Sequence, residues 1–146
     1  MKRNPEIMQY QSDKLSYWLC VLSIISNAVY FVSIYANKDV APDVTTGADI
    51  LLNIIFMMLT FLSSEKLKGY QKRWNILVAA IGAVQILRVL WLPMHFNRLE
   101  MLTGGKFTLA VVTLLVSGVL LLLAGINSSI NIRVLNRYVD ENRVGE

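Results

Sequence analysis

Long apolar blocks separated by short polar segments dominate the chain. About 20 predominantly apolar residues in a helix cross roughly 30 Å of hydrocarbon, and four blocks reach that length. The predicted spans cover approximately residues 15–35, 48–67, 75–94 and 107–126. The second span is the weakest, because Asp49 lies near one end and Glu65 and Lys66 lie at the other. The pattern predicts an all-α membrane protein.

Beyond Ile126 the pattern changes, and apolar residues alternate with asparagine and arginine. This mixture predicts that the fourth helix continues outside the bilayer to about residue 138, with its basic side near anionic lipid. No repeat, low-complexity tract or linker divides the spans. We therefore expect a single transmembrane domain over residues 1–146, built as an antiparallel four-helix transmembrane bundle with short loops.

Composition supports the membrane assignment and narrows the chemistry. Hydrophobic residues make up 55% of the chain, charged residues make up 16%, and the mean hydropathy is +0.50. These values exclude a disordered chain and an ordinary soluble domain. The chain has one cysteine, Cys20, and one histidine, His95, which cannot form an intrachain disulfide or supply a zinc site. We expect no metal and no cofactor.

Lysine and arginine are distributed unevenly between the two sides of the predicted spans. Lys38, Arg98 and Lys106 lie on one side, and Arg88 lies inside the third span. The other ten of the 14 lysine and arginine residues lie on the opposite side: Lys2, Arg3, Lys14, Lys66, Lys68, Lys72, Arg73, Arg133, Arg137 and Arg143. Because these residue types concentrate in cytoplasmic loops, both termini are predicted to be cytoplasmic, in what we expect to be the plasma membrane. The net charge of +4 then indicates attraction to anionic lipid at the cytoplasmic face, and no nucleic-acid partner is expected.

Each predicted span carries one narrow face of small or polar residues. At 100° per residue, the members of the faces in the first, second and fourth spans project to the same side of their helix. These faces are Ser16, Cys20, Ser23 and Asn27 with Tyr30 beside them; Asp49, Asn53, Thr60 and Ser64; and Ala110, Thr113, Ser117 and Ala124, continuing to Asn127 and Asn131. The third span offers a small patch, Ala79, Gly82 and Ala83, followed by Gln85 and Arg88. Such faces favour close helix packing with interhelical hydrogen bonds, and a hydrated path or ligand cavity is the alternative.

Arg88 is the one ionised group that the span assignment places within the hydrocarbon. Its isolated burial would cost at least about 2.5–3.5 kcal/mol, so a partner is expected. Asp49 begins the second span on the same side of the membrane, and a salt bridge assisted by Gln85 would satisfy both charges. We therefore predict a binding or structural polar cluster of Arg88, Gln85, Asp49 and Asn53. Snorkelling of Arg88 to the headgroups is the alternative.

Two local signals concern helix ends. Thr46, followed three residues later by Asp49, is typical of a capping box at a helix start. Pro93 is expected to close or kink the third helix at its outer boundary.

The expected function is non-catalytic, because no nucleophile and base can be paired and Cys20 and His95 are predicted to lie near opposite membrane faces. The chain is predicted to be an accessory or structural subunit of a larger membrane complex or a homo-oligomer, with other membrane subunits or further copies as partners. The alternative is a transporter or channel component for a small anionic solute that uses the cluster around Arg88 and Asp49.

Overall fold

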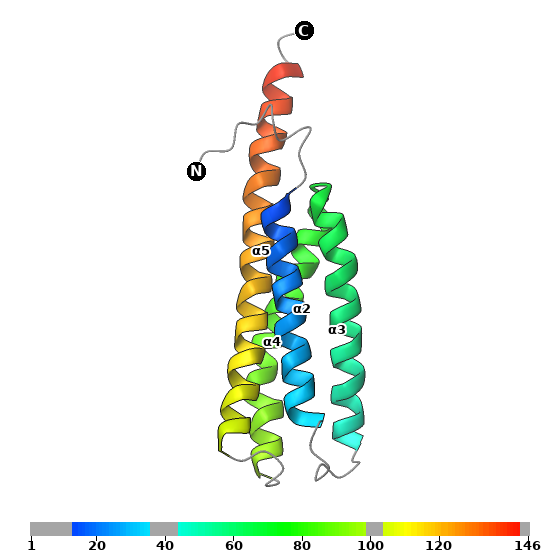
Figure 1. Ribbon diagram of the computed structural model, residues 1–146. Helices are drawn as coiled ribbons and strands as arrows, with labels where there is room; N and C mark the ends of the chain where they lie inside the picture. The colour runs from blue at the N-terminus through cyan, green and yellow to red at the C-terminus, as the bar shows by residue number, and fades with distance from the viewer. Residues whose placement is uncertain (1–12, 36–43, 99–103, 144–146) are drawn as a thin grey trace.

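The computed structural model describes residues 13–35, 44–98 and 104–143. These residues form four helices, which are α2 (Lys14–Tyr35), α3 (Val44–Lys68), α4 (Lys72–Arg98) and α5 (Gly105–Arg143) (Figure 1). Each helix contains one predicted span and is long and apolar enough to cross a membrane. The all-α prediction is therefore confirmed, and the four helices indicate an integral membrane protein. Lys2, Arg3 and Lys38, used above to predict orientation, lie outside the described residues.

Side chains and turns define the helix ends. Asp13 caps α2, because its Oδ1 accepts a hydrogen bond from the backbone N–H of Ser16 at 3.3 Å. Tyr70 adopts a left-handed conformation (φ 53°) in the turn that follows α3. The predicted capping box at Thr46 is wrong. The helix α3 already begins at Val44, and the Thr46 hydroxyl has no hydrogen-bond partner among the described residues.

Helices α4 and α5 continue past their predicted C-terminal limits. Pro93 lies inside α4, which continues to Arg98, so this proline does not close the helix. The fourth helix continues past Ile126 as predicted and ends at Arg143. At 39 residues, α5 is about 58 Å long and projects beyond the other three helices (Figure 1).

The helices lie side by side in one bundle (Figure 1). The helix α5 packs extensively against α4 and α2, α2 also packs against α3, and α3 against α4 is the smallest of these four interfaces. The backbone N–H of Asp13 donates to the Lys68 carbonyl at 3.3 Å, which fixes the start of α2 beside the end of α3. Asn75 near the start of α4 donates to Ser129 of α5 at 2.8 Å.

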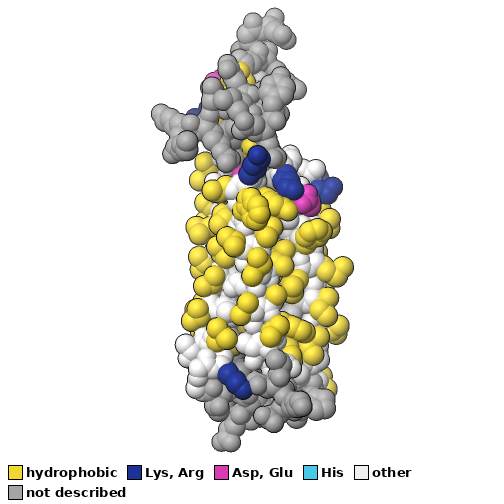
Figure 2. Space-filling view, in the orientation of Figure 1, with side chains coloured by type: hydrophobic (Ala, Val, Ile, Leu, Met, Phe, Trp, Pro, Cys, Tyr) yellow, Lys and Arg dark blue, Asp and Glu magenta, His cyan; other side chains and the backbone are white. Residues whose placement is uncertain are grey.

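Buried polar side chains share the interior of the bundle with two clusters of apolar side chains, and many large apolar side chains face outward. Figure 2 shows hydrophobic side chains over the middle of the visible face and charged side chains towards its ends. All residues of the predicted polar face of α2 are buried. The four residues of the predicted polar face of α3, Asp49, Asn53, Thr60 and Ser64, are buried as well. Ser23 and Ser117 join α2 to α5 through an Oγ–Oγ distance of 2.8 Å, and Ser26 donates to the Thr113 carbonyl at 2.7 Å. This arrangement suits a lipid environment, where polar groups must find partners within the protein.

Glycines permit the close contact between α4 and α5. A Cβ on Gly82 would lie 2.8 Å from the Gly118 carbonyl oxygen, and one on Gly118 would lie 2.6 Å from Ile86 Cγ1. A Cβ on Gly125 would similarly meet the Ala79 Cβ at 2.9 Å. The predicted small patch on α4 is therefore correct for Gly82 and wrong for Ala83, which is exposed because it projects away from α5.

We expect Gly82→Ala to destabilise the protein by about 1–3 kcal/mol, because the added methyl group meets backbone atoms of α5 that cannot rotate away. Gly47→Ala is the matched control. Gly47 also lies in a helix, but an added Cβ there has nothing within 4 Å, so a gain of about 0–1 kcal/mol is expected from helix propensity. Thermal unfolding in detergent measures both, and equal effects would contradict the close-contact explanation.

Candidate functional site

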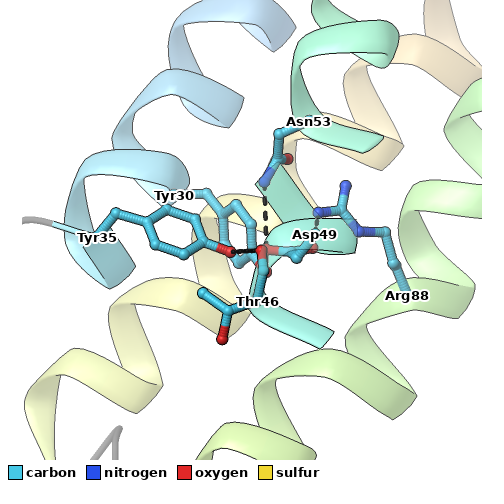
Figure 3. A network of polar contacts seen from close by, with 6 residues as sticks. All are labelled: Tyr30, Tyr35, Thr46, Asp49, Asn53 and Arg88. Carbon is cyan, nitrogen blue, oxygen red and sulfur yellow. Dashed lines mark hydrogen bonds and ion pairs between the residues drawn. The ribbon is translucent and has the colours of Figure 1, made fainter. Parts of the chain in front are cut away.

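Asp49 is the centre of a buried polar network between three helices. Figure 3 shows Tyr30 and Tyr35 of α2 and Arg88 of α4 converging on its carboxylate. One oxygen, Oδ1, accepts from Arg88 Nη2 in an ion pair. The other, Oδ2, accepts from the Tyr35 hydroxyl at 2.6 Å, the Tyr30 hydroxyl at 3.2 Å and Asn53 Nδ2 at 3.3 Å. The network therefore links α2, α3 and α4 through a single carboxylate.

Arg88 is held among aromatic rings as well as beside a carboxylate. Its side chain is 6% exposed and that of Asp49 is fully buried. The guanidinium carbon lies 5.4 Å from the centroid of the Tyr30 ring and 5.7 Å from that of Phe56, within the range of cation–π attraction. The snorkelling alternative is therefore wrong. The guanidinium turns inward to Asp49 because that carboxylate neutralises its charge inside the bundle.

The structure brings together most, but not all, of the predicted cluster. Arg88, Asp49 and Asn53 are connected by hydrogen bonds, and the predicted ion pair is present. Gln85 is buried one turn from Arg88. Among the described residues its side chain makes no hydrogen bond to Arg88 or Asp49, and its Oε1 has no partner. The prediction that Gln85 assists the pair is therefore wrong.

A layer of three buried amides lies about one helical turn from the ion pair. Asn27 precedes Tyr30 by three residues, Asn53 follows Asp49 by four, and Gln85 precedes Arg88 by three. Because the bonds to Asp49 align these helices, the three amides are placed at a similar depth, about 4.5–6 Å from the pair. Each is at most 2% exposed and has at least one polar atom without a partner among the described residues. In Asn27 both the side-chain oxygen and the side-chain nitrogen lack a hydrogen-bond partner among the described residues.

A groove of about 470 Å³ runs between α3 and α4 beside the ion pair. Its lining is almost entirely apolar apart from Asp49 and Arg88: Val44, Thr45, Ala48, Leu52, Phe56, Val84, Leu87 and Trp91. Leu87 and Trp91 are 63% and 74% exposed, so the groove opens on the outer surface of the bundle. Arg88 Nε and Nη1 are buried and have no hydrogen-bond partner in the part of the chain that the structure describes.

Sequence reasoning missed the two tyrosines as donors and missed a second buried carboxylate. Tyr30 continues the inward face of α2, which was the signal for its role. Asp13 is fully buried, and its oxygens accept from Asn127 at 3.4 Å and from Asn131 at 2.9 Å. The spacing of Asn127 and Asn131, one helical turn apart on a predicted inward face, could have indicated a shared acceptor.

The site's chemistry is that of a neutralised ion pair whose carboxylate, but not its guanidinium, has a full set of hydrogen bonds within the described residues. Among residues 13–35, 44–98 and 104–143, no three His, Cys, Asp or Glu side chains gather as metal ligands would. Cys20 and His95 lie in the described helices α2 and α4, and Cys20 is buried as a free thiol. The Asp49 carboxylate receives four donors, so its lone pairs are committed to holding the helices together.

No protein-family model, curated protein or solved structure matches the chain.

Removing one member of the ion pair should be much more costly than removing both. Asp49→Asn or Arg88→Met alone leaves one buried charge without its counter-ion, and a loss of about 3–5 kcal/mol is expected for each. The double variant removes both charges and keeps an acceptor for Tyr30 and Tyr35. It should therefore be more stable than either single variant, as measured by thermal unfolding in detergent.

The exposed pair of Glu65 and Lys68 provides the control. Lys68 Nζ lies 3.0 Å from Glu65 Oε1, and the Glu65 and Lys68 side chains are 44% and 34% exposed. Because water screens such a pair, Glu65→Gln should change the free energy of unfolding by only about 0–1 kcal/mol. Strictly additive losses in the Asp49 and Arg88 double variant would show that the two charges are not coupled.

Proposed function

We propose that this protein is a non-catalytic accessory or structural subunit of a larger membrane assembly. The observation that carries the proposal is the apolar groove between α3 and α4, which opens on the outer surface of the bundle. Helix association in a bilayer depends on packing and on interhelical hydrogen bonds, because lipid tails are as apolar as the side chains. A groove between two helices supplies the packing surface that such association requires.

The occupant we propose for the groove is a transmembrane helix that carries a hydrogen-bond acceptor at the depth of Arg88. Arg88 lines the groove, and its Nε and Nη1 have no acceptor among the described residues. A hydrocarbon tail would fill the groove without satisfying these donors, whereas a Ser, Thr, Asn or Gln side chain of a partner helix would fill it and, once the Arg88 side chain turns towards the groove, accept from one of them. The partner's polar residue would then add to the bonding of a buried cation.

The arrangement we propose in the membrane is an antiparallel bundle with both termini in the cytoplasm, in the plasma membrane. Support comes from the described basic residues. Lys14, Lys66, Lys68, Lys72 and Arg73 all lie near the end of the bundle at which α2 begins and α3 ends. The positive-inside rule assigns that end to the cytoplasm.

Photo-crosslinking tests the docking groove. We expect a photo-reactive phenylalanine analogue in place of Leu87, inside the groove, to crosslink to a second polypeptide in intact membranes. The same analogue in place of Val119, which is 45% exposed on α5, is the control and should react with lipid alone. A product of twice the chain's mass would identify the partner as a second copy and the assembly as a homo-oligomer.

Ala48→Trp tests whether blocking the groove releases the partner. The larger side chain fills the groove from α3 and should weaken partner retention about 30-fold, the effect of losing an interface hot spot, while thermal stability is preserved. Lipid adducts alone at both crosslinking positions would overturn the proposal.

The second candidate is a transporter or channel component for a small anionic solute. The layer of Asn27, Asn53 and Gln85 favours it, because buried amides with unpartnered atoms beside a cation are groups that a solute or water could bind.

Asn27→Leu discriminates between the two candidates. An accessory role predicts unchanged or increased thermal stability, because the substitution removes two buried polar atoms that lack partners. It also predicts no efflux of chloride or phosphate from proteoliposomes above that of empty vesicles. The transport role predicts measurable efflux by the original protein and its loss in a folded Asn27→Leu variant. Asn131→Leu, which removes a 2.9 Å bond to Asp13, is the destabilising control.

A further inference from the structure

The seam between α4 and α5 carries a series of hollows at the end where α4 begins. A polar cavity of about 250 Å³ is lined by Lys72, Asn75, Ser129 and Arg133, among others. A mostly apolar groove of about 340 Å³ adjoins it and is lined by residues such as Ile76, Ala79, Ile126 and Ile130. The two hollows share Asn75, Ile76, Ser129 and Arg133. A cationic cavity therefore continues directly into an apolar groove.

Neither Lys72 nor Arg133 forms an ion pair with an acidic side chain among the described residues. Both side chains are exposed, and the ion pairs of the described helices join other residues, Glu65 with Lys68 and Asp49 with Arg88. Ser129 accepts a hydrogen bond from Asn75 Nδ2 at 2.8 Å, so its own hydroxyl proton can be donated to a ligand. The cavity thus presents two cations and one hydroxyl donor.

The depth of this cavity matches the headgroup region of a bilayer. The 26 residues between Lys106 and Arg133 carry no charge and extend about 39 Å as a helix. A bilayer is about 30 Å thick in its hydrocarbon and about 40–45 Å with its interfacial regions. If the uncharged stretch spans the hydrocarbon, Arg133 lies among lipid phosphates, and the Asn75–Ser129 bond keeps the start of α4 beside it.

We propose that the α4–α5 seam binds one anionic phospholipid. Its phosphate lies between Lys72 and Arg133, and one acyl chain follows the apolar groove along Ile76 and Ile130. Free phosphate would use only the cavity, whereas a phospholipid uses the cavity and the groove together. The lipid assignment depends on the bilayer placement proposed above but not on the α3–α4 groove, so the two proposals can fail independently.

Native mass spectrometry tests this site. The protein is reconstituted in equal amounts of phosphatidylglycerol and phosphatidylcholine and then released into mild detergent. We expect one phosphatidylglycerol to remain bound in preference to phosphatidylcholine. Lys72→Gln and Arg133→Gln should each weaken this retention about fivefold, since a basic residue at an anionic surface contributes about that factor. Ile130→Ser should weaken it by removing part of the groove wall.

Lys66→Gln is the matched control, because it removes the same charge at the same end of the bundle but from outside the seam. Its retention of phosphatidylglycerol should equal that of the original protein. An equal loss in this control, or no preference for phosphatidylglycerol, would overturn the proposal. Displacement of the lipid by inorganic phosphate at millimolar concentration would show an anion site without the tail groove and would also overturn it.

Discussion

The bond between Asp49 and Arg88 must be made inside the protein, because the surrounding lipid can solvate neither charge. The side chains of this network come from three helices, with Tyr30 and Tyr35 on α2, Asp49 on α3 and Arg88 on α4. The carboxylate is satisfied only when all three helices are packed at one relative depth. A sliding movement of α3 by one turn would leave two buried ions unpaired, so the pair also fixes the alignment of the bundle.

Different interactions hold different helices in place. The contact of α4 with α5 depends on close approach at Gly82 and Gly118, and that of α2 with α5 depends on the paired hydroxyls of Ser23 and Ser117. The helix α3 has no comparable close seam with α4, and their interface is the smallest of the four. The ion pair compensates for this limited packing. The same limited packing produces the apolar groove, which is why the groove and the charged pair lie together.

Much of this arrangement followed from the sequence because helical periodicity fixes which residues share a face. The inward face of α2 and the Arg88–Asp49 pair could be predicted by counting residues along each span. Periodicity does not specify which neighbouring helix a face meets. Ala83 was therefore grouped with Gly82 although it projects outward. Gln85 was predicted to assist Arg88, although among the described residues it makes no hydrogen bond to Arg88. The contribution of Gly118 depends on its crossing point with α4, which a single span does not reveal.

Two buried carboxylates tie the two ends of α2 to neighbouring helices. Asp13 joins its start to Asn127 and Asn131 of α5, and Asp49 receives Tyr30 and Tyr35 near its end. Moving α2 relative to α5 would break the Asp13 bonds, whereas separating α3 from α4 would break the one ion pair that joins them. A partner that supplied an acceptor to Arg88 would lower the cost of that separation. The α3–α4 boundary, the smallest of the four interfaces, is therefore where the proposed membrane partner would displace the least packing.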